Sequence, residues 1–246
     1  MSVFSMIKAY NKSRKPPVCT AVIAAAGSSQ RCKGEDKLFY SVFNKPVLAH
    51  TIEVFQKCEY INDIIIVARE DKFDRIAEIC AEYKFKKVSG IIKGGDTRPQ
   101  SVLNGIFAAS KKTTLVAIHD GARPCITADI LKKTIKKASK CQASAPAIPI
   151  TSTIKSIENG VISNTISRTG LYEIQTPQVF RIELIKAALT NAMKKSIEIT
   201  DDCMAAEVLK IPIHITEGSR KNIKITDIDD MHLIKAFLNE DNESCE

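Results

Sequence analysis

The sequence predicts an α/β domain built on a largely parallel sheet. Short apolar runs, such as 64–67 and 115–118, are typical of strands buried on both faces, and helical patterns alternate with them. Strands that alternate with helices in this way form a parallel sheet with helices on both faces. Gly27, Gly95 and Asp120 each follow a predicted strand. Because such sheets bind ligands at the carboxyl ends of their strands, we expect a binding site there.

The first half of the chain contributes four strands and four helices to this prediction. Apolar runs bounded by turn residues indicate the strands, whereas apolar residues three and four positions apart indicate the helices. Pro46 suits the first turn of a helix. The predicted strands are 21–26, 64–67, 88–92 and 115–118, and the predicted helices are 45–57, 71–83, 99–109 and 127–140.

The alternation stops after the fourth helix. Strands are predicted at 145–150, 151–157 and 161–167, and the last two form a hairpin about Asn159-Gly160. This hairpin has few apolar residues with which to form a core of its own. It is therefore either a projecting arm that packs on a second subunit or a surface hairpin folded back on its own domain.

The rest of the chain continues the same domain, since no internal repeat or interdomain linker interrupts it. The predicted elements are helices at 182–194 and 201–209, strands at 211–215 and 222–226, and a C-terminal helix. The expected organisation is a flexible tail at 1–17, a single domain at 18–240 with a β-arm at about 150–170, and an acidic tail at 241–246.

Composition favours a small molecule that bears phosphate as the ligand. The 246 residues are 44% hydrophobic, enough to bury a sizeable core, and the net charge is +8. Nucleic acid is the usual partner of so basic a chain, but the sequence has no Trp and no long Lys/Arg stripe with interleaved aromatic residues. We therefore expect no nucleic acid partner.

The cysteines and the apolar runs favour a cytoplasmic protein. The eight cysteines form no C-x-x-C pair and no zinc-spaced cluster with histidine, so we expect reduced, mostly buried thiols. No apolar run approaches the roughly 18 residues of a membrane span. The N-terminal stretch lacks the apolar region of a secretory signal. We expect no association with a membrane.

The segment 20–37 carries the clearest signal for a phosphate site. Its strand ends at Gly27, and small polar residues follow, which lets backbone N–H groups approach an anion. Arg31 and Lys37 then supply two cations. The segment lacks the Gly-Lys-Ser/Thr of a P-loop and the G-x-G-x-x-G fingerprint that an NAD-linked oxidoreductase would need. The alternative interpretation is a strand followed by a solvated basic loop.

Further candidates lie at other strand ends. Asp120 could hold Mg²⁺ or ligand hydroxyls, or could cap the following turn. Arg123, whose backbone is constrained by the next residue, could reach the same site. Ser101 could hydrogen-bond the edge of a base or cap a helix, and Lys224, inside a strand-like pattern, faces either solvent or an anion. The histidines have no paired nucleophile, so we interpret them as structural.

Seven motifs together resemble a known family. They are AVIAAAGSSQR with Lys37, GGDTRPQSV, HDGARP, ITSTIK, SRTGLYEIQTPQVF, ITDD and EGSRKNIKIT. In this order, over about residues 20–238, they closely resemble the 2-C-methyl-D-erythritol 4-phosphate cytidylyltransferases of the non-mevalonate isoprenoid pathway. The resemblance implies a Rossmann-like nucleotidyltransferase domain with a β-arm for homodimerisation. It also implies CTP and a polyol phosphate as substrates and Mg²⁺ as the cofactor.

The resemblance assigns a role to individual residues. The cations on the CTP phosphates would be Arg31 and Lys37, and those that position the polyol phosphate would be Lys224 and, from the partner's arm, Arg168. The residues that would line the nucleotide are Ala24, Ala25, Gly27, Gly95, Asp96 and Ser101. The residues that would hold the polyol and its phosphate are Asp120, Arg123, Thr153 and Thr176, with Asp120 also near the metal.

The first loop departs from the pattern of this family. Ser29 stands where a second Gly is common, Cys32 where Met is common and Leu38 where Gln is common, and the loop is short before Lys37. Two alternative functions are compatible with most of these motifs. One is a ribitol 5-phosphate cytidylyltransferase, and the other is a non-catalytic nucleotide-binding paralogue, which would be expected to have lost a cation such as Lys37.

Overall fold

The computed structural model describes residues 17–27 and 36–243 of the chain. The tail predicted at 1–17 lies outside these residues apart from Pro17, and so do the last three residues of the predicted acidic tail. Within the described part of the chain, no helix has the length and apolar character needed to cross a lipid bilayer.

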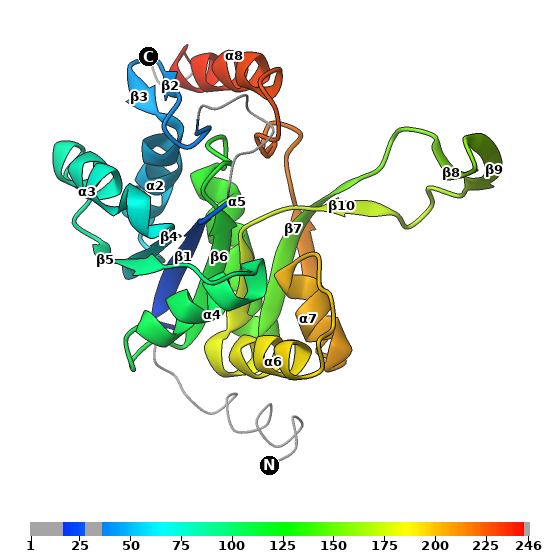
Figure 1. Ribbon diagram of the computed structural model, residues 1–246, viewed down its shortest axis with the longest axis horizontal. Coiled ribbons are helices and arrows are strands. Elements are labelled where there is room, and N and C mark those ends of the chain that lie inside the picture. The colour runs from blue at the N-terminus through cyan, green and yellow to red at the C-terminus, as the bar shows by residue number, and fades with distance from the viewer. Residues whose placement is uncertain (1–16, 28–35, 244–246) are drawn as a thin grey trace.

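β1 (Cys19–Ala25) lies inside a mostly parallel sheet (Figure 1). It pairs in parallel with β4 (Asp63–Ala68) on one side and with β6 (Leu115–Asp120) on the other. β4 pairs in parallel with β5 (Val88–Lys93). These four strands therefore present their carboxyl ends at one edge of the sheet, as the alternation of strands and helices predicted.

The sheet continues beyond β6 with antiparallel strands. β11 (Gln178–Arg181) pairs antiparallel with β6, and β7 (Ala143–Pro149) pairs antiparallel with β11. β10 (Tyr172–Ile174) and β12 (His214–Glu217) also pair with β7. The sequence did not predict β10 or β11, because three and four residues are too few to establish a period.

Helices cover both faces of the sheet. Ala21 and Ile23 of β1 are fully buried in one hydrophobic core, whereas Val22 between them is fully buried in the other. Strands buried on both faces are apolar throughout, which explains the continuous run in this part of the sequence. The first core contains side chains of α2 (Val47–Lys57), α3 (Phe73–Glu82), α5 (Ala128–Cys141) and α8 (Asp230–Glu243). The second contains side chains of α4 (Arg98–Ala108), α6 (Ile182–Lys194) and α7 (Asp202–Val208).

Short polar residues set where the helices begin. Thr97 accepts a hydrogen bond from the backbone of Gln100 at the start of α4, and Thr127 does the same for α5. Asp201 accepts from the backbone of Met204 at the start of α7. Minor elements complete the chain: β2 (Ser41–Val42) and β3 (Lys45–Pro46) before α2, and a 3₁₀ turn, η1 (Glu70–Lys72), before α3.

The predicted hairpin is present as β8 (Ile154–Glu158) and β9 (Val161–Ile166), and it extends well away from the sheet (Figure 1). Asn159 and Gly160 both have positive φ, 49° and 80°, as a tight hairpin turn requires. Its apolar side chains are exposed; Val161, for example, is 68% exposed. The hairpin therefore has no core of its own.

Of the two strands predicted near the end of the sequence, one has shifted bounds and the other is absent. The strand predicted at 211–215 begins later, as β12, so Ile211 packs in the second core instead of joining the sheet. Residues 222–226 form no strand, although their polar and apolar residues alternate. Their backbone bonds to other segments: the N–H of Ile225 donates to the carbonyl of Ala122 at 2.9 Å.

Gly105 lets α4 lie close to the sheet. A Cβ at this position would be 2.7 Å from side-chain carbons of both Val22 on β1 and Val67 on β4. Real Cβ atoms essentially never approach other heavy atoms so closely, and both valines belong to strands that cannot shift independently. The glycine therefore fixes the depth at which α4 packs, and with it the position of residues at its N-terminus.

We predict that Gly105→Ala lowers the free energy of unfolding by about 1–2 kcal/mol, because overpacking outweighs the helix propensity of alanine. Urea unfolding monitored by circular dichroism measures the change. Gly90→Ala on β5 is the control, since a Cβ there would lie 3.5 Å from Ile92, an ordinary contact. A Gly105→Ala protein as stable as the unmodified protein would contradict the close approach.

Candidate active site

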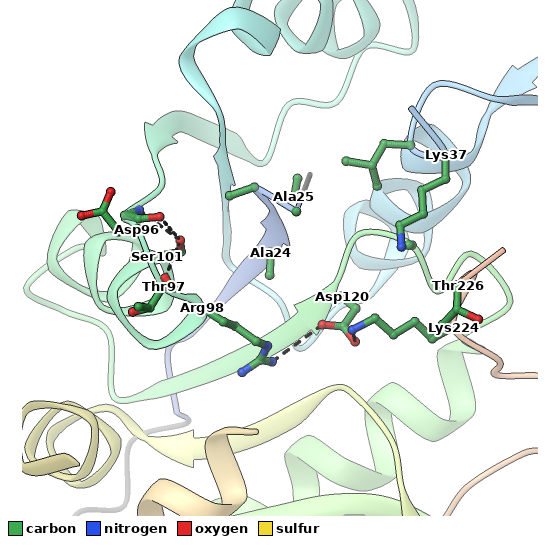
Figure 2. Close-up of a pocket in the computed structure, with 15 residues that line it drawn as sticks. Ala24, Ala25, Lys37, Asp96, Thr97, Arg98, Ser101, Asp120, Lys224 and Thr226 are labelled. Carbon is green, nitrogen blue, oxygen red and sulfur yellow. Dashed lines mark hydrogen bonds and ion pairs between the residues drawn. The ribbon is translucent and has the colours of Figure 1, made fainter. Parts of the chain in front are cut away.

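A cavity of about 530 Å³ opens at the carboxyl ends of the parallel strands. This volume lies within the range typical of small-molecule sites. Its lining residues come from the ends of β1 and β6, the start of α4 and the segment before α8 (Figure 2). They are residues 24–27, 37, 38, 95–98, 101, 120, 122, 224 and 226. The site predicted at this edge of the sheet is therefore a real cavity.

Asp120, the last residue of β6, is surrounded by cations. Nζ of Lys224 lies 3.0 Å from Oδ2 of Asp120, Nε of Arg123 lies 3.5 Å from the same oxygen, and an Nη of Arg98 lies 3.7 Å from Oδ1. Figure 2 shows the carboxylate between Arg98 and Lys224. Burial alone would raise the pKa of Asp120, but Lys224 and Arg98 hold it well below its ordinary value. The carboxylate is therefore ionised at neutral pH.

Arg98 connects this carboxylate to a second, fully buried one. Its Nη2 lies 2.9 Å from Oδ2 of Asp202, the first residue of α7. Burial raises the pKa of Asp202, and Arg98 opposes that shift. Burial would likewise lower the pKa of Arg98, but Asp202 and Asp120 keep it raised. Arg98 is thus a permanent cation at the wall of the cavity.

Lys37 and Lys224 approach the cavity from neighbouring segments. Nζ of Lys37 donates a hydrogen bond to the carbonyl of Ile225 at 2.7 Å. Figure 2 shows both lysine side chains directed toward Asp120 from the same side of the cavity. Arg31, the other cation predicted for the first loop, lies outside the described residues.

The opposite wall is the segment predicted to line a nucleotide. The hydroxyl of Ser101 accepts a hydrogen bond from the N–H of Gly95 at 3.0 Å and donates one to the carbonyl of Thr97 at 3.0 Å. Gln100 accepts a bond from the N–H of Asp96 at 3.1 Å. Ser101 therefore holds the shape of this loop while lining the cavity, so both its predicted roles, as a site residue and as a local capping group, are compatible with its position.

Thr176 and Arg123 lie behind the cavity wall and do not line it. The Thr176 hydroxyl accepts a bond from the N–H of Asp120 at 3.3 Å and lies 2.9 Å from Nδ1 of His119. Nη1 of Arg123 donates to the carbonyl of Asn222 at 2.6 Å. Burial lowers the pKa of His119 to about 4, so this imidazole is neutral and serves as a hydrogen-bonding support. Within one chain, these residues position Asp120 and its neighbours.

Two other predicted residues lie on or beside the projecting hairpin. Thr153 is exposed just before β8, and Arg168 is exposed just after β9, where its guanidinium contacts the carbonyl of Thr151. Neither lines the cavity of its own chain. Contact of Thr153 and Arg168 with a substrate would need the cavity of a second copy of the chain, so this role stays a prediction.

The cavity offers few ligands for a metal ion. Within the described residues, no group of three or more His, Cys, Asp or Glu side chains could hold one. Asp96 and Asp120 are the carboxylates on the cavity wall. This donor set fits Mg²⁺ that takes its other ligands from water and substrate phosphates, as Mg²⁺ commonly does.

Sequence reasoning missed Arg98 and Asp202. Both lie inside motifs already singled out, GGDTRPQSV and ITDD, but neither was given a role. The available signal was a pair of opposite charges at the starts of two predicted helices. Their pairing became visible only when α4 and α7 were found on the same face of the sheet.

The fold and cavity define a Rossmann-like α/β protein with a site suited to an anionic ligand: the carboxyl ends of the parallel strands present small residues, fixed cations and the carboxylates of Asp96 and Asp120. A family model described as 2-C-methyl-D-erythritol 4-phosphate cytidylyltransferase matches residues 19–240. The chain therefore belongs to this family, as its motifs predicted.

Relatives and solved structures agree with this assignment. Proteins named 2-C-methyl-D-erythritol 4-phosphate cytidylyltransferase from Clostridium acetobutylicum and Dehalococcoides mccartyi are 41% and 39% identical to the chain, each over 89% of it and over 96% and 95% of their own lengths. A crystal structure of 4-diphosphocytidyl-2C-methyl-D-erythritol synthase from Anaerococcus prevotii superposes with a TM-score of 0.81 at 30% identity, covering 91% of this chain and 97% of that one. The corresponding structure from Thermus thermophilus has a TM-score of 0.73 at 25% identity, over 89% and 98% of the two chains.

We predict that Arg98→Leu lowers the free energy of unfolding at pH 7 by about 3 kcal/mol, because it leaves buried Asp202 without its cation. The double variant Arg98→Leu/Asp202→Leu should recover most of the loss. At pH 5 the loss from Arg98→Leu should be smaller, because the raised pKa of Asp202 lets the unpaired carboxyl take up a proton. Urea unfolding at both pH values measures these differences.

Arg69→Leu is the matched control for this pair. Arg69 lies 2.7 Å from Asp71, but the two side chains are 44% and 55% exposed, and such surface pairs contribute little to stability. If the double variant were as unstable as Arg98→Leu alone, the buried carboxylate would not be the cause of the loss.

Proposed function

We propose that the protein transfers the cytidylyl group of CTP to 2-C-methyl-D-erythritol 4-phosphate. The products are 4-diphosphocytidyl-2-C-methyl-D-erythritol and pyrophosphate. The observation that supports this proposal most directly is the cavity wall itself. Asp120 is ionised and stands between Arg98 and Lys224, at the carboxyl edge of the sheet of a chain that belongs to this family.

The reaction needs charge neutralisation more than proton transfer. A phosphate monoester has a second pKa of about 6, so the attacking oxygen is already anionic at neutral pH. That oxygen forms a bond to the α-phosphorus of CTP, and the bond from this phosphorus to the bridging oxygen of pyrophosphate breaks. Both reactants are anions, so catalysis consists of positioning them and offsetting their charge. A catalytic histidine or cysteine is not required, in keeping with the buried, neutral state of His119.

The described residues suit these tasks. Lys37 stabilises the CTP phosphates, Lys224 positions the phosphate of the acceptor, and Asp120 beside Lys224 serves ligand hydroxyls. A Cβ on Gly27 would meet no atom of the described residues within 4 Å, so the cavity wall is open at this point. By the family resemblance, Arg31 is the second cation on CTP, and Ala24, Ala25, Gly95, Asp96 and Ser101 line the nucleotide.

Mg²⁺ is part of the proposal. When bound, it neutralises charge on the triphosphate. Asp120 is the side chain best placed to contribute a ligand, because it lines the cavity and carries its charge at neutral pH. Three cations already face this carboxylate, so the protein's own residues keep it oriented.

We further propose that the enzyme is a homodimer in the cytoplasm. The exposed apolar side chains of the hairpin, such as Ile157 and Val161 at 57% and 68%, need a partner surface. A second copy docked on the hairpin would bring Thr153 and Arg168 to its neighbour's cavity. No two of the six described cysteines form a disulfide with each other, which suits a reducing compartment.

We predict that pyrophosphate is released only when CTP, Mg²⁺ and 2-C-methyl-D-erythritol 4-phosphate are all present. A coupled assay for pyrophosphate measures the rate, with ATP and UTP as nucleotide controls and ribitol 5-phosphate as the alternative acceptor. Faster turnover with ribitol 5-phosphate would show that the protein is a ribitol 5-phosphate cytidylyltransferase instead. No release with either acceptor would contradict catalysis and favour a non-catalytic nucleotide-binding protein.

We predict that Arg168 acts in the neighbouring subunit and Lys224 in its own. Proteins carrying Arg168→Ala or Lys224→Ala should each be nearly inactive. When the two are unfolded together and refolded as a mixture, roughly one site in four should regain both residues, since half the dimers are mixed and each has one intact site. The same pyrophosphate assay measures the recovery.

The control is each variant refolded alone, which should stay inactive. Dimer exchange is verified by mass spectrometry of a mixture in which one variant is isotopically labelled. If exchange occurs without recovery, Arg168 acts within its own chain, and the proposal of a trans-acting arm is wrong.

A further inference from the structure

Lys224 lies on a segment that has no regular secondary structure to hold it. The segment, residues 218–226, forms most of the connection between β12 and α8, yet it places Nζ of Lys224 3.0 Å from Asp120. Lysine has a long side chain with many rotamers, so its position depends on how firmly its backbone is held. The contacts of this segment therefore determine how well the site is formed.

Gln175 holds the first part of the segment. This side chain is 1% exposed and follows β10 directly. Its Nε2 donates to the carbonyl of Ser219 at 2.8 Å, and its Oε1 accepts from the N–H of Ser219 at 3.2 Å. A single amide thus satisfies both backbone groups of one residue, as a neighbouring strand would.

Asn222 holds the second part. It is fully buried, and its Nδ2 donates to the carbonyl of Thr176 at 2.9 Å and to Oε1 of Gln175 at 3.3 Å. Its own backbone carbonyl accepts the bond from Arg123 at 2.6 Å. Oδ1 of Asn222 is buried with no hydrogen-bond partner among the described residues. Such an atom costs stability, so the position of Asn222 is not explained by stability alone.

Gly218 leaves room for the side-chain amide of Gln175. A Cβ at this position would lie 2.6 Å from Oε1 of Gln175 and 3.1 Å from the backbone of Ala147 on β7. The N–H of Gly218 also donates to the carbonyl of Ala147 at 3.0 Å. The segment therefore leaves the edge of the sheet at a point where only glycine leaves room for the glutamine amide.

We propose that Gln175 and Asn222 are positioning residues that hold Lys224 in place for the transfer reaction, an inference that rests on the function proposed above. They do not line the cavity, and they act through the backbone that precedes the lysine, at Ser219 and Asn222. Their loss lets the Lys224 backbone shift away from Asp120. The affinity for CTP is retained, because no hydrogen bond among the described residues joins either amide to the nucleotide wall at the start of α4.

A double-mutant cycle on the rate of pyrophosphate release tests this inference. When Lys224 is present, Asn222→Ala should lower kcat/KM for 2-C-methyl-D-erythritol 4-phosphate by about tenfold or more. When Lys224→Ala is already present, the same change should lower kcat/KM by less than about twofold, because the effects of residues that act as one unit are not additive. The dissociation constant of CTP, measured by calorimetry, should be nearly unchanged by Asn222→Ala. Equal losses in the two backgrounds would contradict the proposal.

Two further variants separate positioning from simple loss of stability. Gln175→Glu keeps the oxygen that accepts from Ser219 but loses the donor, so its kcat/KM should lie between those of the unmodified protein and Gln175→Leu. Thr20→Val removes a buried hydroxyl that pairs with Thr113 at 2.8 Å, away from the cavity lining, and should lower stability without lowering kcat/KM. A Thr20→Val protein with the same kinetic defect would indicate a general effect of destabilisation.

Chemical labelling tests the position of Lys224 independently of catalysis. An amine-reactive ester is allowed to compete among the lysines, and mass spectrometry reports the modification of each. Asn222→Ala should increase labelling of Lys224 several-fold, because its amine is no longer held on Asp120. Lys133, paired with Asp129 on α5 at 2.7 Å, is the internal control. Unchanged labelling of Lys224 would contradict the positioning role even if the enzyme proved to have another substrate.

Discussion

The buried carboxylate of Asp120 is the charge around which the cavity is organised. A carboxylate is unfavourable inside a protein unless cations and hydrogen bonds offset its lost hydration. Here the cations come from three separate places: Arg98 at the start of α4, Arg123 after β6, and Lys224 before α8. All three face the same carboxylate, so this one charge links the end of β6, a helix and an irregular segment at a single point.

The same arrangement keeps the cations ready for anionic substrates. Arg98 is half-buried, and its charge is paired with the carboxylates of Asp120 and Asp202. A guanidinium fixed between two carboxylates loses little freedom when a phosphate approaches. Electrostatic stabilisation is strongest when the charged groups do not have to reorganise. The acidic residues thus serve the site mainly by keeping its positive charge in place.

Much of the fold was predictable because it depends on local patterns. Parallel strands buried on both faces leave continuous apolar runs, and Gly27 and Asp120 at their ends pointed to the cavity. The pairing of Arg98 with Asp202 was not predictable, since it depends on two helices covering the same face. The strand predicted at 222–226 was wrong for a different reason. Polar and apolar residues alternate there as in a strand, but these residues are held by side-chain amides and by the backbone of other segments instead of by a neighbouring strand. The roles of the hairpin residues concern a second chain and stay predictions.

The insertion of β11 between β6 and β7 has a consequence for how the protein is made. Strands leave the ribosome in chain order, yet β7 cannot reach the sheet until β11 has been synthesised and has paired with β6. The contact between Lys37 and Ile225, 188 positions apart, comes later still. A nascent chain can build its four parallel strands and their helices early, since domains fold as synthesis proceeds. Its cavity is complete only when residue 226 has emerged, because Lys224 and Thr226 form part of the lining.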